Sequence, residues 1–216
     1  MGALGGGAYL FLYSGGDGEV KPYTIAFPDK LLDGQYAKRT TPLADETAKA
    51  ADAQAKSAGI SHGTAVAALY GDDKQGITVS GIYGTIADPR KAVDDYASHL
   101  DDQQKIYAEK VSKNPAGVKV TTVTPLTEFH PDGFDGAVIK CKATAFTSTV
   151  ASNTAKFDVT TCVWGDSSAV GIVQNTVSKN DAPVGIGNSD ISPDVMSTQD
   201  LSEATVKVRN EVRKAK

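Results

Sequence analysis

The stretch that decides the fold is residues 141–168, CKATAFTSTVASNTAKFDVTTCVWGDSS. It contains the only two cysteines of the chain, Cys141 and Cys162, and its only tryptophan, Trp164. Strand-forming residues stand on both sides of a polar centre at residues 147–153, which is typical of two strands joined by a turn. The stretch therefore predicts a long β-hairpin with paired strands at 136–146 and 157–164.

The two cysteines predict a bond across this hairpin. If the hairpin centres on Ser152, Cys141 and Cys162 lie almost opposite each other, within the Cα separation that a disulfide needs. By closing a loop of this length, the bond would stabilise the fold by about 3 kcal/mol. A disulfide also indicates an oxidising compartment outside the cytoplasm. The alternative is two unlinked core cysteines. A zinc site is not expected, because the chain has no CxxC pair and its three histidines are scattered.

The turn that follows the hairpin is the candidate binding surface. It comprises Trp164, Asp166, Ser167 and Ser168. A tryptophan beside a turn can anchor a partner molecule. The alternative is that Trp164 packs in the core and covers the disulfide, so the exposure of its side chain distinguishes the two interpretations.

A weaker alternative makes the same turn catalytic. Residues 165–169, GDSSA, approach the GxSxG pattern of a hydrolase, with Ser167 as the nucleophile and His130, His62 or His99 as the base. Such an elbow leads from a strand into a helix, whereas residues 169–177 are rich in β-branched residues and predict a strand. The sequence therefore favours a protein that is not an enzyme, and it predicts no cofactor.

Local patterns predict the other elements and an α+β fold, in which about three helices pack on an antiparallel sheet. Asp88-Pro89 is a helix start, and Pro125 indicates an edge strand or a bend. Gly81 suggests a bulge or a close helix crossing. Further strands are predicted at 22–27, 64–70, 77–86, 118–129 and 169–177, helices at 42–58, 89–111 and from 197 onward, and loops at 130–136 and 178–193.

The last predicted helix ends in positive charge. Arg209, Arg213, Lys214 and Lys216 stand near its C-terminus, where they complement the helix dipole. An alternative role for this cluster is contact with anionic lipid.

The N-terminal residues suggest attachment to a membrane. Residues 1–13 are uncharged and apolar, too few to span a bilayer alone, so we interpret them as the outer part of a truncated transmembrane helix. Residues 14–21 form a Gly-rich linker, and residues 22–216 a single extracytoplasmic domain. The net charge of −4 and the lack of a basic patch argue against nucleic acid as a partner.

Several motifs resemble those of a known group of proteins. The segments are CVWGDSSAVG at 162–171, GFDGAV at 133–138, FPDKLL at 27–32 and VSGIYG at 79–84. Together they resemble uncharacterised membrane-anchored or secreted proteins of actinobacteria. In these, one transmembrane helix precedes an extracytoplasmic α+β domain. The resemblance implies this location and a disulfide, and it carries over no functional residue. The element order is also similar to the PsbP-like α+β sandwich, which is an analogy of fold alone.

These observations predict a non-enzymatic module at the cell envelope, held at the membrane by its N-terminal helix. Its ligand would be a protein, a cell-wall component or a small molecule. The alternative is a sensor or accessory domain coupled to cytoplasmic partners.

Overall fold

The computed structural model describes residues 20–40, 43–57, 60, 63–112, 118–134, 136–150, 153–181 and 194–215. Within them, three helices accompany a large antiparallel sheet, so the predicted α+β class is confirmed. In chain order the elements are β1 (Tyr23–Ile25), β2 (Lys30–Leu31), β3 (Tyr36–Arg39), α1 (Leu43–Ser57), β4 (Thr64–Gly71), β5 (Gln75–Tyr83), α2 (Pro89–Ser112), β6 (Lys119–Phe129), β7 (Val138–Val150), β8 (Asn153–Asp166), β9 (Ala169–Asp181), α3 (Thr198–Val212) and β10 (Arg213–Ala215).

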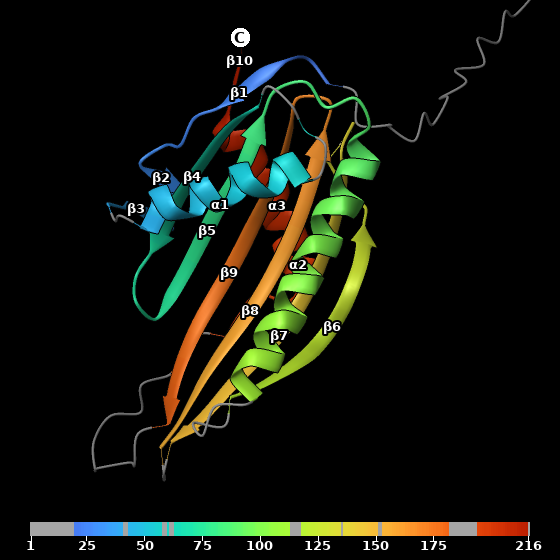
Figure 1. Cartoon of the computed structure of the whole chain (residues 1–216). Coiled ribbons are helices and arrows are strands. Elements are labelled where there is room, and N and C mark those ends of the chain that lie inside the picture. The colour runs from blue at the N-terminus through green and yellow to red at the C-terminus, as the bar shows by residue number, and fades with distance from the viewer. Residues whose placement is uncertain are drawn as a thin grey trace, which may run out of the picture.

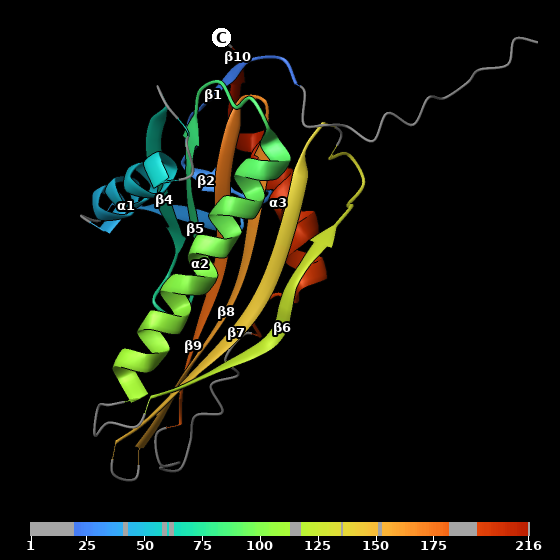
Figure 2. The same cartoon turned by 45° about the vertical axis from the view of Figure 1, so that its right-hand side comes forward.

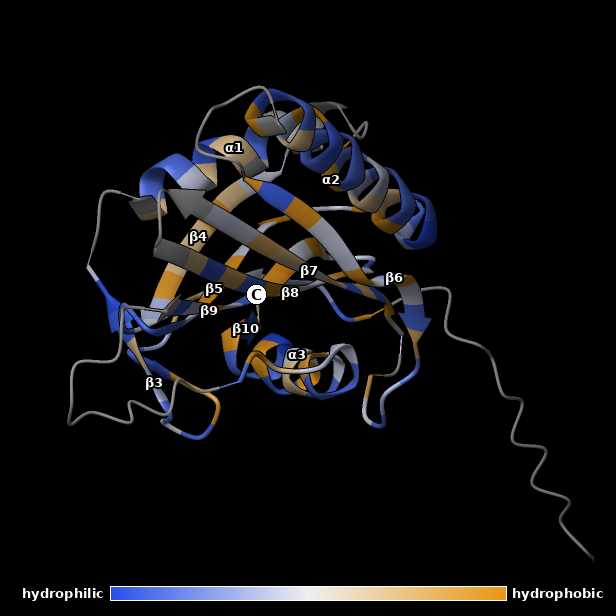
Figure 3. Ribbon diagram, turned by 90° about the horizontal axis from the view of Figure 1, so that it is seen from below, coloured by the Kyte–Doolittle hydropathy of each residue, from blue (hydrophilic) through white to orange (hydrophobic). Residues whose placement is uncertain are grey.

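The large sheet has helices on both of its faces. Its eight strands run in the order β2-β3-β4-β5-β9-β8-β7-β6, and a separate two-stranded sheet pairs β1 with β10. Helices α1 and α2 lie on one face and α3 lies on the other (Figures 1 and 3). Figure 2 shows α2 running along the length of the sheet, and the strands that it packs against most are β8 and β7. Two apolar clusters result, a larger one towards α3 and a smaller one under α2.

The predicted hairpin is confirmed, and it is longer than expected. Strands β7 and β8 pair without interruption from Val138 opposite Gly165 to Val150 opposite Asn153, and Cys141 lies directly opposite Cys162. Most of the polar centre is therefore strand rather than turn, because its Thr and Ser residues fit a pleated ribbon. Residues 178–181, expected in a loop, likewise belong to a strand, since β9 pairs with β8 as far as Asp181, and the rest of the expected loop, residues 182–193, lies outside the described residues.

The predicted helix starts are also confirmed. The carboxylate of Asp88 accepts a hydrogen bond from the Lys91 amide at 2.9 Å, and the hydroxyl of Ser197 accepts one from the Asp200 amide at 3.1 Å. Both side chains satisfy backbone donors that the first turn of a helix leaves without a partner. The caps fix where α2 and α3 begin, and the two helices pack on opposite faces of the sheet (Figure 3).

The prediction for the C-terminus was wrong. Helix α3 ends at Val212, and residues 213–215 form β10, which pairs with β1 from Tyr23 opposite Ala215 to Ile25 opposite Arg213. The guanidinium of Arg213 lies 4.7 Å from the centre of the Tyr23 ring. Local charge predicted a longer helix, but pairing with a distant strand and this contact favour the extended backbone instead.

Of two further strand predictions, one needs adjustment and the other is confirmed. The strand expected at 77–86 spans Gln75–Tyr83, and Gly81 makes its close approach to β9 rather than to a helix. A Cβ atom at Gly81 would lie 2.7 Å from the carbonyl oxygen of Val170. Pro125 is confirmed in the edge strand β6, whose pairing with β7 shifts register on both sides of Thr124.

Candidate functional site

Trp164, the proposed anchor of the turn, is a core residue. Its side chain is 1% exposed, and it belongs to the same apolar cluster as the disulfide. Gly171 lies directly opposite on β9, where a Cβ atom would meet the indole at 2.9 Å. The glycine therefore makes room for the ring, and the prediction that Trp164 offers an exposed contact was wrong.

Asp166 is also buried, and four hydrogen bonds occupy its carboxylate. One oxygen accepts bonds from the amides of Ser168 at 2.8 Å and Ala169 at 3.0 Å, which closes the turn between β8 and β9. The other accepts the hydroxyl of Tyr23 at 2.6 Å and Nε of Arg209 at 2.9 Å. Asp166 thus joins the turn to β1 and to α3. It presents no face to a ligand, since its exposure is zero.

Arg209 is the residue of this cluster that sequence reasoning misplaced. It was expected at a basic, solvated helix end, yet it is 1% exposed. Its guanidinium lies 5.0 Å from the Phe134 ring centre and 6.0 Å from that of Trp164. Nη2 is 2.8 Å from the same Asp166 oxygen, as an ion-pair contact rather than a second hydrogen bond. The carboxylate of Asp166 and the faces of the two aromatic rings together offset the cost of burying the guanidinium.

Ser167 and Ser168 hold the chain's own backbone. The hydroxyl of Ser167 accepts a bond from the Val20 amide at 2.8 Å and donates to the Val20 carbonyl at 3.2 Å. The carbonyls of Ser167 and Ser168 accept bonds from the amides of Ile86 and Gly84. The turn from Trp164 to Ser168 is therefore a connection between segments of this domain.

The surroundings of Ser167 differ from those of a catalytic elbow. The residue lies in a hairpin turn, and strand β9 follows it where an elbow would require a helix. Among the described histidines, His99 lies beside Gln103 on α2 and His130 lies 3.8 Å from Glu128. His62 lies outside the described residues.

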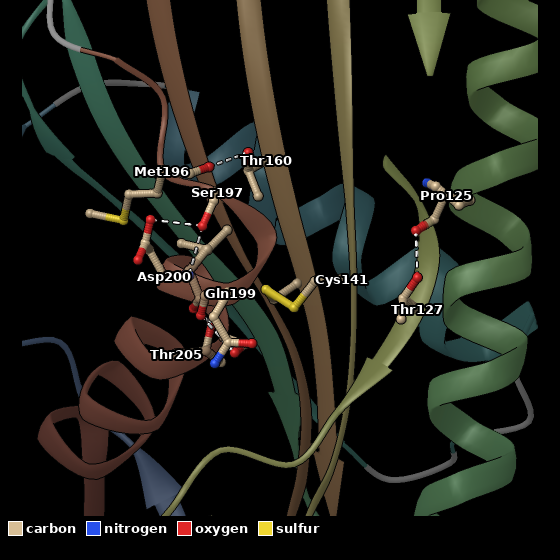
Figure 4. The surroundings of a disulfide bond; sticks show 12 residues. Pro125, Thr127, Cys141, Thr160, Met196, Ser197, Gln199, Asp200 and Thr205 are labelled. Carbon is tan, nitrogen blue, oxygen red and sulfur yellow. Dashed lines mark hydrogen bonds between the residues drawn. A yellow bond between two sulfur atoms is a disulfide. The ribbon is translucent and has the colours of Figure 1, made fainter. Parts of the chain in front are cut away.

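The disulfide between Cys141 and Cys162 is present, as predicted. Figure 4 shows it on the side of the sheet that carries α3, near Thr160 and Thr205. The hydroxyl of Thr160 donates to the Met196 carbonyl at 2.6 Å, which holds the segment before α3 against β8. The disulfide and α3 thus belong to one buried layer.

The candidate functional site lies on the opposite face of the sheet. A groove of about 390 Å³ runs between α1 and α2, and the four central strands β5, β9, β8 and β7 form its floor. This volume is typical of sites for small molecules. Most of its lining surface is apolar, although more than half of its described lining residues have polar side chains: Thr47, Ala50, Thr78, Ser80, Tyr96, Leu100, Gln104, Tyr107, Lys142, Thr144, Phe146, Val159, Thr161, Ile172 and Gln174.

Strand register brings four of the polar residues into one row across the floor. Thr78 pairs with Gln174, Gln174 with Thr161, and Thr161 with Lys142. Gln174 donates to the Thr161 hydroxyl at 3.2 Å, which leaves the proton of that hydroxyl available to a ligand. In the described part of the chain, the hydroxyl of Thr78 has no hydrogen-bond partner. We call these four residues the polar row.

Lys142 ends the polar row and is held by α2. Its ammonium group donates to a carboxylate oxygen of Asp101 and, at 2.8 Å, to the amide oxygen of Gln104. An ammonium has three donors, so one remains for a ligand. Lys140, two residues before it, pairs in the same way with Asp94 on α2. These pairs hold α2 along β7 and neutralise the charge of Lys142 within the groove.

An apolar hollow continues the groove along α2. This second hollow of about 580 Å³ is lined by Tyr107, Val118, Phe146, Ser148 and Phe157. Tyr107 and Phe146 line both spaces. Their rings pack edge to face, with 6.0 Å between the ring centres. The combined site therefore has a polar row in its middle and an aromatic end near the tip of the β7–β8 hairpin.

Sequence reasoning did not identify this site. The sequence signal for the site is the alternation of side chains in the strands of its floor. Thr78 stands between the buried residues Ile77 and Val79, and Lys142 stands between the buried residues Cys141 and Ala143. Alternation gives the face of each side chain. Alternation cannot predict that β5 pairs with β9, and this pairing brings Thr78 beside Gln174.

Neither a scan against models of known protein families nor a search of curated proteins finds a match to this chain. In the part of the chain that the structure describes, no helix is both long and apolar enough to cross a membrane. The apolar residues 1–13, interpreted as part of such a helix, lie outside the described residues.

Proposed function

We propose that this protein is a non-enzymatic binding module of the cell envelope, whose ligand occupies the groove between α1 and α2. The observation that supports this most is the groove itself, because a cleft whose surface is largely apolar and onto which polar groups converge is the usual form of a small-molecule site. The Trp164–Ser168 turn is not part of the proposal, since its groups are already used within the fold.

The disulfide supports a location outside the cytoplasm. Such bonds persist in oxidising compartments and are rare in reducing ones. Anchoring by residues 1–13 is the second part of the proposal. The bonds from Val20 to Ser167 and from Tyr23 to Asp166 fix the chain at the β8–β9 turn. The aromatic end of the groove lies at the other end of the sheet, so an anchored domain would present it away from the anchor.

A neutral apolar dye tests the binding site. We expect N-phenylnaphthylamine, which fluoresces in apolar surroundings, to bind the protein saturably. Val159→Trp should abolish the signal, because Val159 is half-buried on the groove floor and an indole there would fill the space. Val123→Trp is the matched control, since Val123 on β6 is 65% exposed and outside the groove.

Both variants should unfold at the temperature of the parent protein to within a few degrees. Saturable dye binding that survives Val159→Trp, or no saturable binding to the parent protein, would contradict the groove as the site. The location is tested separately, by asking whether Cys141 and Cys162 are oxidised in protein isolated from its native cells with thiols blocked at lysis.

A further inference from the structure

The groove discriminates between ligands by charge. Among its described lining residues, Lys142 alone carries a charge, and Asp101 already faces its ammonium group. An anionic ligand would have to share Lys142 with that carboxylate, and a cation would face the ammonium. A charge moved from water to such a site is unfavourable unless it gains a partner of its own. The lining is thus matched to an uncharged ligand.

The polar row nevertheless offers hydrogen bonds. Thr78 and Thr161 provide hydroxyl groups, and Lys142 provides its remaining donor. The oxygen of a neutral head group could accept from these donors. A purely hydrocarbon ligand would leave them without partners, which costs affinity.

The aromatic end defines the other part of the ligand. Phe157 lies four positions before Thr161 along β8, which corresponds to about 13 Å in a strand. Phe157 is 40% exposed and Tyr107 48%, so this end is apolar and open to solvent. An apolar chain that reaches from the polar row to Phe157 would cover both rings.

The floor also argues against an extended peptide. Strands β5, β9, β8 and β7 are interior strands, so each pairs on both sides. A peptide that binds by strand addition needs a free sheet edge, and the floor of this groove has none.

From these features we propose that the ligand is an uncharged amphiphile with a single apolar chain. Its hydrogen-bonding head lies on the polar row, and its chain lies along α2 towards Phe157. The inference rests on the proposed binding function and adds the chemical class and the orientation of the ligand.

Competition with the dye tests the charge preference. Dodecanol, dodecanoate and dodecylammonium share one chain length and differ in head-group charge. Dodecanol is used below its solubility limit, and the two charged compounds are used below the concentrations at which they form micelles. We expect dodecanol to displace N-phenylnaphthylamine from the parent protein at a concentration at least about tenfold lower than either charged compound. Dodecanoate as the strongest competitor would overturn the inference and leave the binding function standing. Absence of dye binding would instead remove the binding function itself.

Two variants test the orientation. Thr161→Val removes a hydroxyl of the polar row at nearly constant size, and we expect it to weaken dodecanol about threefold to tenfold. Thr121→Val on β6, exposed and outside the groove, should have no effect. Phe157→Ser should weaken dodecanol but not hexanol, whose chain is too short to reach that ring. Equal losses for both alcohols, or none with Thr161→Val, would overturn the proposed orientation.

Discussion

On the α3 face the central strands carry a disulfide, Trp164 and a buried ion pair, whereas on the α1–α2 face the same strands carry threonine, glutamine and lysine. The two faces also differ in how their polar groups are used. Every carboxylate bond of Asp166 goes to the protein itself, while Thr161 and Lys142 keep donors to spare. Buried polar groups without spare capacity stabilise a fold, and those with spare capacity are available to a ligand.

The largest expected effect is the loss of the buried carboxylate. Asp166→Ala leaves Arg209 without a partner and removes the bonds that close the β8–β9 turn. We expect the free energy of unfolding to fall by about 3–5 kcal/mol, as measured by denaturant titration.

The control is a pair of the same charges at the surface. Asp73, which is 91% exposed, contacts Arg39 at 2.7 Å. Asp73→Ala should cost less than about 1 kcal/mol. If Asp166→Ala does not fold, Asp166→Asn, which keeps the side-chain shape, replaces it. A loss below 1 kcal/mol in both Asp166 variants would show that the α3 face does not depend on this pair.

The disulfide should have the next largest effect. Replacing Cys141 and Cys162 together by Ala opens a loop with a sequence separation of 21 residues. We expect a loss of about 3 kcal/mol, because the unfolded chain regains conformational entropy. Dithiothreitol should lower the stability of the parent protein by a similar amount and leave the double variant unchanged. A parent protein unaffected by complete reduction would contradict this stabilising role.

A smaller loss of stability is expected from a change at Gly171, which leaves room for the ring of Trp164. Gly171→Ala places a methyl group 2.9 Å from the indole, which must shift in a packed core. We expect a cost of about 1–3 kcal/mol. Gly76→Ala in β5 is the matched control, because its nearest neighbour would lie at 3.4 Å, an ordinary contact. If the two variants are equally stable, the fit between Trp164 and Gly171 does not constrain the α3 face.

Alkaline pH tests the phenol within the same cluster. Burial, reinforced by Asp166, raises the pKa of Tyr23 far above its ordinary value of 10.0. The unfolded state therefore releases the phenolic proton at lower pH than the folded state. Stability should be unaffected below pH 10 and fall as the pH rises further.

One pH unit above that value, Tyr23 should account for about 1.4 kcal/mol of lost stability. The measurement is the unfolding free energy at pH 9 and pH 11 for the parent protein and for Tyr23→Phe. The variant should lose less between the two pH values, because its ring cannot ionise. An equal loss in both proteins would show that Tyr23 ionises freely in the folded state.

The two faces also differ in how far the sequence predicts them. The hairpin, the start of α3 and the pairing of Cys141 with Cys162 follow from local patterns, and they build most of the α3 face. Arg209 could not be placed, because its partner Asp166 is 43 residues away and only the fold brings them together. The groove likewise depends on the pairing of β5 with β9, between segments that are far apart in the sequence.

The smallest effect on stability is expected on the groove face. Lys142→Met removes the ammonium group and keeps an unbranched chain of similar length. Asp101 is left without this partner, but its side chain is 39% exposed and remains hydrated. The cost should therefore stay below about 1 kcal/mol, in contrast to Asp166→Ala. Denaturant titration of both variants under one set of conditions makes the comparison. A loss of 3 kcal/mol or more at Lys142 would mean that the polar row stabilises the fold as the α3 face does. It would argue against the proposal that the polar row binds a ligand.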